Sequence, residues 1–214
     1  MMNKTVFVID NERSGLQSVT KLLRSAGHAL KEFTSSKAFL CEPLQPSAAC
    51  VILNMHHAET SGVEVLDALE QRAISMPVIC VTEYGSISMC VRAMRAGAWE
   101  FLAKPIDSET LLRAVDQALM VAHDTYKMQC DLFVSKQRYD TLTRREREVL
   151  SLALNGLLNK QIACRLGIQE GTVKLHKRKV MEKMGTKRLV DLIRMTALIK
   201  GQVVRGTYES FIKP

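Results

Sequence analysis

The sequence predicts an α/β domain with a five-stranded, doubly wound parallel sheet, followed by an all-α domain of four helices. Short apolar runs alternate with longer amphipathic stretches over residues 4–121, whereas only helical patterns occur over residues 140–200. The charge divides in the same way: residues 1–125 carry 11 Lys and Arg against 14 Asp and Glu, and residues 126–214 carry 19 against 8. The basic second domain is therefore expected to face a polyanion, such as nucleic acid, an anionic membrane surface or an acidic partner.

The bulk composition is that of a soluble globular protein, with 47% hydrophobic and 24% charged residues in 214. The first residues, MMNKTVFVIDNERSG, contain no apolar stretch long enough for a signal peptide, and no later stretch could span a bilayer. We therefore expect a cytoplasmic protein whose six scattered cysteines are reduced. Cys50 and Cys80 fit neighbouring positions on adjacent strands, and small core positions equally well.

Five apolar runs predict the strands of the first domain, at residues 5–9, 29–33, 50–54, 77–82 and 100–103. Between them, apolar residues recur at helical spacing, and Ser14 and Ser108 are the expected N-caps of the first and last helices. Connections this short indicate right-handed βαβ units with helices on both faces of the sheet.

The carboxyl ends of parallel strands meet at one edge of a sheet, where ligands and chemistry usually collect. This edge is expected to hold Asp10, Asn11, Asn54, Thr82 and Lys104, the last followed by proline. Position 54 carries an amide where a carboxylate could act as a nucleophile. The identity of this residue therefore determines whether the edge can carry out such chemistry.

The motifs VFVIDNE, VILN, PVICVTEYG and RAMRAGAWEFLAKP, with their spacing, resemble the receiver domain of bacterial two-component response regulators of the FixJ type. The resemblance covers residues 4–121 and implies a CheY-like, flavodoxin-like fold. In that family an acidic pair after the first strand holds Mg²⁺, and an aspartate ending the third strand accepts a phosphoryl group. A Thr or Ser on the fourth strand and a Lys before proline then contact the phosphate.

Residue by residue, this sequence departs from the family at two of three carboxylates. Asn11 stands where the second, metal-binding acid belongs, and Asn54 stands where the phospho-acceptor belongs. An amide is a poor nucleophile, and Mg²⁺ prefers charged oxygen ligands. We expect a receiver fold without phosphorylation, metal or cofactor. The positions that match the family are the acid Asp10, the phosphate-contacting Thr82 and Lys104, and the switch aromatic Phe101.

Two histidines follow Asn54, but they are the weaker indication. His56 and His57 are adjacent and would point apart in extended chain, so they are expected to be solvated loop residues. Metal binding or pH sensing is the alternative, and it would need a third ligand from Glu59, Glu83 or Asp10.

Residues 122–139 contain no Pro or Gly and predict a linker helix. Such a helix could pair with its copy in a homodimer or serve as a solvated spacer. The next helix starts with Thr143 and Glu146 in a capping-box pattern. Further helices are expected to end at Gly167 and Gly185, and the last to span 189–199.

Residues 159–178 are predicted to form a helix-turn-helix, whose second helix would enter the major groove. Val173, Val180 and Met184 fall on one face of that helix, with His176 beside them. From Lys174 to Arg188 there are seven basic residues and one acid. This bias favours a nucleic-acid surface over a generic basic one.

The segment LTRREREVLSLALNGLLNKQIACRLGIQEGTVKLHKRKVMEKMGTKRLVDLIRM resembles the LuxR-type (NarL/FixJ) DNA-binding domain along almost its whole length. The resemblance implies that bases are read at Lys174, Leu175 and Arg178. The expected phosphate contacts are Lys160, Thr172, Lys177 and Lys179. An apolar stripe on the last helix forms the dimer contact in relatives, with packing inside the monomer as the competing explanation; it comprises Leu189, Leu192, Ile193 and Thr196.

The sequence therefore predicts a bacterial transcription regulator that binds promoter DNA as a homodimer, with a tail at residues 201–214. RNA polymerase or another signalling protein is a further candidate partner, and no membrane is involved. The receiver is expected to act without phosphorylation, as a dimerisation module or as a sensor of a ligand or partner. The alternative is an adaptor that binds other regulators without reading DNA. An enzyme is disfavoured, because the strand ends offer no activated nucleophile.

Overall fold

The computed structural model describes residues 4–44, 47–56 and 62–212. The chain divides into two compact units, Met1–Lys127 and Met128–Pro214. Each unit has its own hydrophobic core. In the part of the chain that the structure describes, no helix is both long and apolar enough to cross a membrane.

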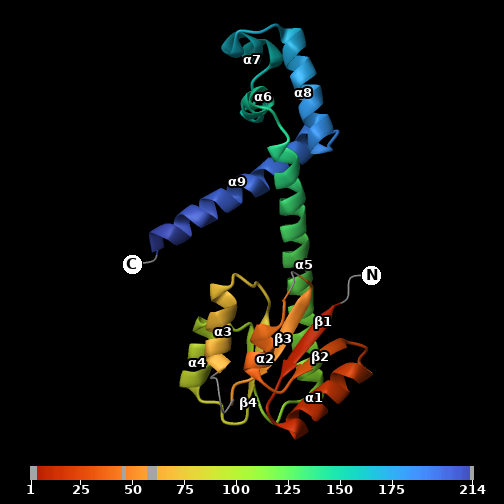
Figure 1. The fold of residues 1–214 in the computed structure, drawn as a ribbon, viewed down its shortest axis with the longest axis vertical. Helices are drawn as coiled ribbons and strands as arrows, with labels where there is room; N and C mark the ends of the chain where they lie inside the picture. Colours follow the sequence, from red (N-terminus) through yellow and green to blue (C-terminus); the bar gives the residue numbers. More distant parts are fainter. Residues whose placement is uncertain (1–3, 45–46, 57–61, 213–214) are drawn as a thin grey trace. The chain divides into compact units, whose positions relative to one another are not determined.

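The first unit contains a parallel sheet of five strands in the order β2-β1-β3-β4-β5 (Figure 1). Every predicted strand is present within one residue of its expected ends. This topology places the carboxyl ends of β1, β3, β4 and β5 at one edge. The strands are β1 (Thr5–Ile9), β2 (Ala29–Phe33), β3 (Ala49–Asn54), β4 (Val78–Thr82) and β5 (Glu100–Ala103).

Five helices cover the two faces of this sheet. They are α1 (Arg13–Ser25), α2 (Ser36–Cys41), α3 (Gly62–Gln71), α4 (Ile87–Arg95) and α5 (Ser108–Asp140). Leu23 of α1 and Leu119 of α5 pack with the strand side chains of one face. Phe39 of α2, Leu66 of α3 and Ala93 of α4 pack with those of the other. The doubly wound arrangement predicted from the sequence is confirmed.

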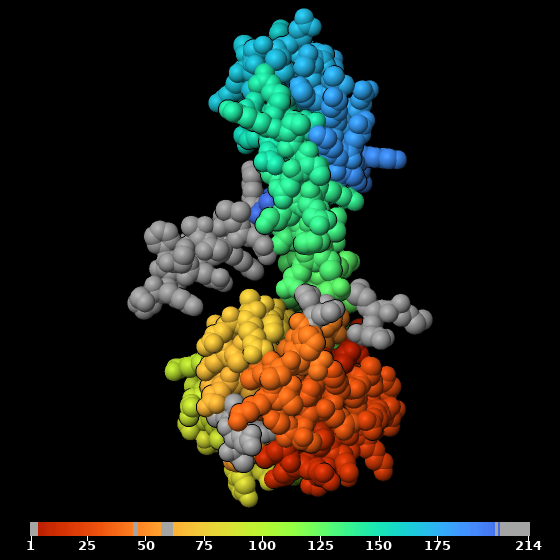
Figure 2. Space-filling view, viewed as in Figure 1, coloured from red at the N-terminus to blue at the C-terminus, as the bar shows by residue number. Residues whose placement is uncertain are grey.

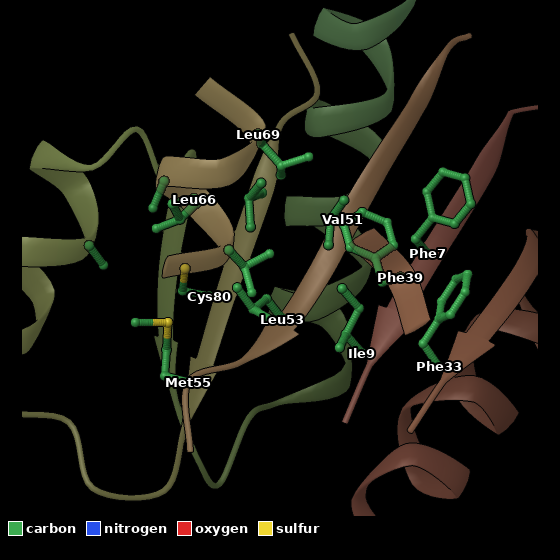
Figure 3. Packing of buried hydrophobic residues seen from close by; sticks show 14 of the residues in the cluster. Phe7, Ile9, Phe33, Phe39, Val51, Leu53, Met55, Leu66, Leu69 and Cys80 are labelled. Atoms are coloured by element: carbon green, nitrogen blue, oxygen red, sulfur yellow. The ribbon is translucent and has the colours of Figure 1, made fainter. Parts of the chain in front are cut away.

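The core under α2 and α3 is aromatic at one end and aliphatic at the other (Figure 3). Phe7, Phe33 and Phe39 form a cluster with ring centroids 5.4–6.2 Å apart. Leu53 of β3 is completely buried beside them. In the space-filling view, the side chains of this unit, coloured from red to yellow, form a closely packed surface (Figure 2). Aromatic and aliphatic burial on both faces fixes the strand register that positions the edge.

Both predicted N-caps of the first domain are wrong. Helix α1 begins at Arg13, so Ser14 lies inside it, and the N-cap is Glu12. Ser108 is likewise the first helical residue of α5, and the carboxylate of Asp107 accepts the Thr110 N–H at 3.0 Å. An aspartate before the serine takes the capping role because its carboxylate accepts the orphan N–H.

The two buried cysteines do not face each other. Cys50 packs on the α1/α5 face of the sheet and Cys80 on the opposite face, and the strand register pairs Cys80 with Leu53. Burial raises the pKa of both thiols to about 12. They are unreactive core residues, the second of the two interpretations that the sequence allowed.

The predicted linker is helical, since α5 runs without a break to Asp140. The second unit adds four helices. They are α6 (Arg144–Leu154), α7 (Asn159–Leu166), α8 (Glu170–Met184) and α9 (Leu189–Ile212). The last helix continues beyond its predicted end at 199, into the residues expected to form a tail.

Capping explains where the helices of the second unit begin and end. Thr143 and Glu146 form the predicted capping box at the start of α6. Gly167 and Gly185 end α7 and α8 in the left-handed conformation, with φ of 63° and 65°. Glycine adopts this conformation without the steric cost that a Cβ imposes. The helix-turn-helix therefore comprises α7, the turn at Gly167 and α8.

Candidate functional site

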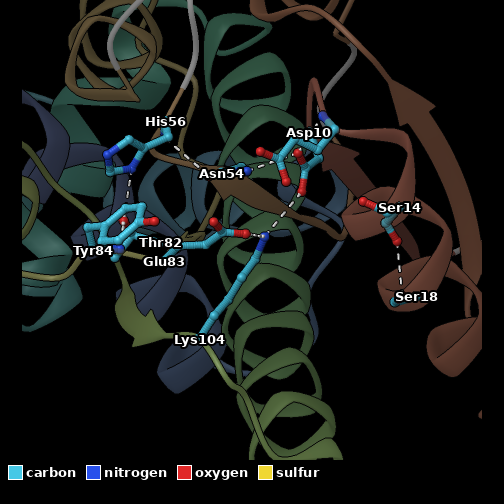
Figure 4. Close-up of polar contacts among 10 residues, drawn as sticks. Asp10, Ser14, Ser18, Asn54, His56, Thr82, Glu83, Tyr84 and Lys104 are labelled. Atoms are coloured by element: carbon cyan, nitrogen blue, oxygen red, sulfur yellow. Dashed lines mark hydrogen bonds and ion pairs between the residues drawn. The ribbon is translucent and has the colours of Figure 1, made fainter.

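Four polar side chains from four different strand ends converge at the edge of the sheet (Figure 4). Asp10 follows β1, Asn54 ends β3, Thr82 ends β4 and Lys104 follows β5. Asp10, Asn54 and Thr82 are buried, although they are polar. The edge therefore brings these four residues together as predicted from the sequence, and Asn11, which directly follows Asp10, is exposed.

Both ends of the Asn54 amide are occupied by hydrogen bonds. Its Nδ2 donates to Oδ1 of Asp10 at 2.9 Å, and its Oδ1 accepts the backbone N–H of His56 at 3.1 Å. The same Asp10 oxygen also accepts the backbone N–H of Glu12 at 2.9 Å. The neutral donor of Asn54 thus satisfies a buried carboxylate, and the amide oxygen is engaged by the backbone of His56.

Lys104 is held by carboxylates and not by position 54. Its Nζ lies 3.1 Å from Oε1 of Glu83 and 3.9 Å from Oδ2 of Asp10. Sequence reasoning named Glu83 as a possible metal ligand and missed it as the partner of Lys104. The available indication was that Glu83 directly follows the strand-ending Thr82, because a residue just beyond a strand end projects over the same edge.

His56 is an exposed loop residue, as predicted, but it also makes a contact that the sequence did not predict. Its side chain is exposed, yet Nδ1 lies 3.1 Å from Oγ1 of Thr82. The same hydroxyl accepts the backbone N–H of Tyr84 at 3.3 Å, and the rings of His56 and Tyr84 meet edge to face at 5.7 Å. His56 therefore ties the end of β4 to the chain after β3. His57 lies outside the described residues.

Phe101 of β5, the predicted switch aromatic, is partly buried and packs against the core under α2 and α3. Within residues 4–44, 47–56 and 62–212, no group of three His, Cys, Asp or Glu side chains is placed to hold a metal ion.

The inward face of α8 is as predicted. Val173, Val180 and Met184 are buried, the first against Ile162 of α7 and the other two against Leu150 of α6. His176 is partly buried beside them, with its Nδ1 shielded from solvent. This packing turns the opposite, basic face of α8 outward.

The three predicted base-reading residues all lie on that outward face. Leu175 is 40% exposed. The two cations are held by acids one helical turn away: Lys174 Nζ lies 3.2 Å from Glu170, and Arg178 Nε lies 3.7 Å from Glu182. Both ion pairs are exposed, so they are weak enough to be exchanged for a stronger ligand.

The predicted phosphate contacts differ in accessibility. Lys160 and Lys179 are exposed, whereas Thr172 and Lys177 are partly buried. Lys177 Nζ donates to Oδ1 of Asn159 at 3.1 Å, which joins α8 to the first residue of α7. Lys177 therefore has a structural contact inside the helix-turn-helix in addition to its predicted role.

The comparisons with known proteins agree with both halves of this arrangement. Residues 6–116 match the response regulator receiver domain, and residues 140–196 match the bacterial regulatory proteins of the luxR family. The chain is a LuxR-type response regulator. This family consists of transcriptional regulators and not of enzymes.

Relatives of this response regulator align over nearly their whole length. The response regulator protein TmoT of Ectopseudomonas mendocina is 36% identical over 195 residues, which cover 91% of this chain and 89% of TmoT. The transcriptional regulatory protein FixJ of Rhizobium meliloti is 35% identical over 198 residues, covering 91% and 96%. The solved structure of the response regulator StyR superposes with a TM-score of 0.81 at 37% identity, over 91% of this chain and 98% of StyR.

In this response regulator, the predicted dimer stripe on α9 divides between two environments. Leu192 and Thr196 are buried, and Leu192 packs with Leu150 and Val180 in the core of the DNA-binding domain. Leu189 and Ile193 are 43% and 46% exposed. For Leu192 and Thr196 the structure supports the competing explanation of packing inside the monomer, whereas the other two members of the stripe, Leu189 and Ile193, are accessible.

An ion pair between a buried glutamate and a partly exposed lysine connects α6 to α8 in the DNA-binding domain. Glu146 is buried, and its Oε2 accepts the Thr143 N–H at 2.8 Å and Lys183 Nζ at 2.6 Å. Burial alone raises the pKa of the Glu146 carboxyl, but the hydrogen bonds from Lys183 and Thr143 outweigh it and hold the pKa below its usual value. This carboxylate fixes α8 to the start of α6.

Proposed function

We propose that this response regulator binds specific promoter DNA as a homodimer, in the cytoplasm, and is regulated without aspartyl phosphorylation. The observation that supports regulation without phosphorylation is the Asn54 amide, whose Nδ2 donates to Asp10 and whose Oδ1 accepts from the backbone N–H of His56. RNA polymerase or a further signalling protein remains a predicted partner of the same regulator.

The chemistry of the amide argues against phosphorylation at position 54. A carboxylate attacks phosphorus with a charged oxygen, whereas the amide oxygen is neutral and its lone pairs are delocalised. The Asn54 oxygen is also already a hydrogen-bond acceptor within the protein. Thr82 and Lys104, which contact the phosphate in intact receivers, are held instead by His56 and Glu83.

The residues present do not fit a Mg²⁺ site. Mg²⁺ demands near-octahedral oxygen ligands and is usually held by one or two carboxylates plus water. Asp10 is the single acid left of the three, and its Oδ1 already accepts two hydrogen bonds. Its other oxygen lies 3.9 Å from the Lys104 ammonium, which repels a cation. We therefore derive no step that involves a metal.

DNA binding is supported by the exposed side chains of α7 and α8, with Lys174, Leu175 and Arg178 of α8 as base readers. The phosphate contacts are Lys160 of α7 and Lys179 of α8, both exposed, together with the partly buried Thr172 and Lys177. For the homodimer, the exposed Leu189, Val190 and Ile193 of α9 supply an apolar surface. A dimer would read two half-sites about one helical turn apart.

The test of phosphorylation independence is labelling of the full chain with acetyl phosphate and Mg²⁺. We expect no acid-labile phosphate, and operator affinity should be the same with and without the phosphodonor. A stoichiometric acyl phosphate would refute the proposal. The matched variants are Asn54→Asp and Asn11→Asp/Asn54→Asp: the double variant should be labelled much faster than the single one, because only it rebuilds the acidic pair.

DNA recognition is tested separately by a gel shift on the gene's own promoter over a range of salt concentrations. Affinity should fall steeply with salt and exceed that for random DNA. Equal affinity for promoter and random DNA would refute specific binding and would support the alternative of an adaptor.

A further inference from the structure

An open cleft lies between α1 and the segment that joins β5 to α5 in the receiver domain. Its volume of about 650 Å³ falls within the roughly 300–1,000 Å³ range of small-molecule sites. Its floor is aliphatic, with Val19 and Leu22 on one side and Ile106 and Leu111 on the other. Leu111 is buried and the other three are partly buried. An apolar group seated there would be removed from water, which favours binding.

The walls and mouth of the cleft are polar. Ser14 and Ser18 from α1 and Ser108 from α5 are exposed and line it. Figure 4 shows Ser14 and Ser18 on the α1 side, across from Lys104 and Glu83. A few polar groups around an apolar floor are the usual composition of a small-molecule site, because they fix the orientation of the ligand.

Carboxylates outnumber cations at this mouth. Glu12 and Glu83 line the cleft together with Lys104. Lys104 is shared between Glu83 at 3.1 Å and Asp10 at 3.9 Å. The Glu12 carboxylate is exposed and pairs with no cation in the described part of the chain. Two carboxylates and one ammonium therefore line the cleft, and the ammonium also neutralises the buried Asp10. The mouth is left with an excess of negative charge, which attracts a cation and repels an anion.

Helix α1 approaches the ion pair of Asp10 and Lys104 closely at Gly15. A Cβ built on Gly15 would lie 2.7 Å from Oδ2 of Asp10 and 3.3 Å from Nζ of Lys104. Any side chain at position 15 would therefore push against the ion pair. The glycine lets the helix pass close to the edge of the sheet, so that the aliphatic floor and the carboxylates border one space.

We propose that this cleft binds a small organic cation, an ammonium group on an aliphatic or aromatic body. The ammonium lies between Glu12 and Glu83, and the body covers the floor formed by Val19, Leu22, Ile106 and Leu111. The site adjoins the strand ends, since Glu83 and Lys104 belong to both. Binding at this site does not depend on the proposed function, because it requires neither a phosphoryl group nor DNA.

The first test is isothermal titration calorimetry on the full chain with four probes. These are 4-phenylbutylammonium, the neutral 4-phenylbutan-1-ol, the anionic 4-phenylbutyrate, and butylammonium, which lacks the ring. The phenylbutylammonium should bind about tenfold more tightly than the alcohol or butylammonium, which corresponds to about 1.4 kcal/mol for each missing part. The proposal is overturned if phenylbutyrate binds as tightly, or if none of the probes binds at millimolar concentration.

Paired variants locate the binding. Ser18→Trp fills the cleft from α1 and should abolish binding, whereas Ser25→Trp, an exposed serine on the same helix outside the cleft, should leave it unchanged. Glu12→Gln should weaken phenylbutylammonium binding severalfold and leave the alcohol unaffected. Glu64→Gln is the charge control, at the exposed start of α3. Unchanged ammonium binding by Ser18→Trp would overturn the proposal.

Discussion

Restoring the carboxylate at position 54 should destabilise the receiver domain. Asn54→Asp places a carboxylate where the amide Nδ2 now lies 2.9 Å from Oδ1 of Asp10. Two unit charges about 3 Å apart repel by roughly 5 kcal/mol at an effective dielectric constant of about 20. Lys104, 3.9 Å from the other Asp10 oxygen, offsets part of this repulsion. The new carboxyl can also take up a proton, which limits the repulsion that remains. We therefore expect the free energy of unfolding to fall by about 3 kcal/mol at neutral pH.

The pH dependence of this loss of stability follows from the direction in which the pKa of the introduced carboxyl is shifted. Repulsion by Asp10 and burial both raise the pKa of the introduced carboxyl in the folded variant above its unfolded value. Proton binding therefore stabilises the folded variant, fully at low pH, and that stabilisation disappears as the pH rises through the folded pKa. The difference in unfolding free energy between the variant and the natural chain should be about 3 kcal/mol at neutral pH and about 1 kcal/mol near pH 4.5, for a pKa raised by about 2 units.

Trp99 provides the assay. It is the chain's one tryptophan, and its backbone N–H donates to Val78 O, so its fluorescence reports unfolding of the receiver domain within the full chain. Urea titrations of the natural chain, Asn54→Asp and Asn54→Ala would be compared at both pH values. Asn54→Ala is the control for the lost hydrogen bonds, and its loss of about 1–3 kcal/mol should not grow with pH. Equal stability of Asn54→Asp and the natural chain at neutral pH would refute the reasoning.

Three further predictions concern the DNA-binding domain. Arg178→Ala should lower discrimination between operator and random DNA by about 1–3 kcal/mol in competition gel shifts, and an unchanged specificity ratio would remove Arg178 from base readout. Glu182→Gln frees Arg178 from its ion pair and should raise the affinity for random DNA severalfold in the same assay, whereas no change would mean that the pair does not compete with DNA. Glu146→Gln should destabilise α6 by about 1.5–3 kcal/mol at pH 7. Because the pKa of Glu146 is lowered by Lys183 and Thr143, this stabilisation is present above the unfolded pKa and is lost as the pH falls through the folded pKa. Hydrogen exchange of α6, corrected for intrinsic rates, should therefore show the variant and the natural chain converging in acid, and a pH-independent difference would contradict this.

The strands and helices could be predicted because burial imposes a period on the sequence. Strands buried on both faces, such as Val78–Thr82, appear as continuous apolar runs, and the glycines at 167 and 185 mark left-handed helix ends. The N-cap of α5 was mispredicted because Asp107 and Ser108 are both good capping residues, and local sequence alone does not decide between them. At α1 the N-cap is Glu12, which makes no side-chain capping bond, so the sequence carries no capping signal there. The register that separates Cys50 from Cys80 depends on pairing across the sheet, which no short segment contains.

At the edge of the sheet, too, the sequence predicts which residues are present but not every contact between them. Asp10, Asn54, Thr82 and Lys104 could be placed together from strand ends alone. The bond from His56 to Thr82 could not, because it joins residues 26 positions apart through a ring orientation that only the folded loop determines. The apolar stripe of α9 was ambiguous for a related reason: a face that packs inward and a face that binds a second copy have the same helical period.

The geometry around Asn54 also indicates how the polar edge of the sheet in the receiver domain is stabilised without a metal ion. In a receiver with three acids, buried carboxylates lie close together, and Mg²⁺ offsets their repulsion. Here the amide of Asn54 donates a hydrogen bond to Asp10 at the place where a second carboxylate would repel it. The substitution that removes the phospho-acceptor thus also replaces a repulsive contact with an attractive one. Lys104 and Glu83 complete the balance, since together with Asp10 they leave a single excess negative charge at this edge.

It follows that added Mg²⁺ should stabilise the natural chain little, whereas it should stabilise Asn11→Asp/Asn54→Asp by about 2.7 kcal/mol at a hundredfold excess over its Kd. Equal stabilisation of both proteins by Mg²⁺, measured through Trp99 fluorescence, would show that the amide has not replaced the cation.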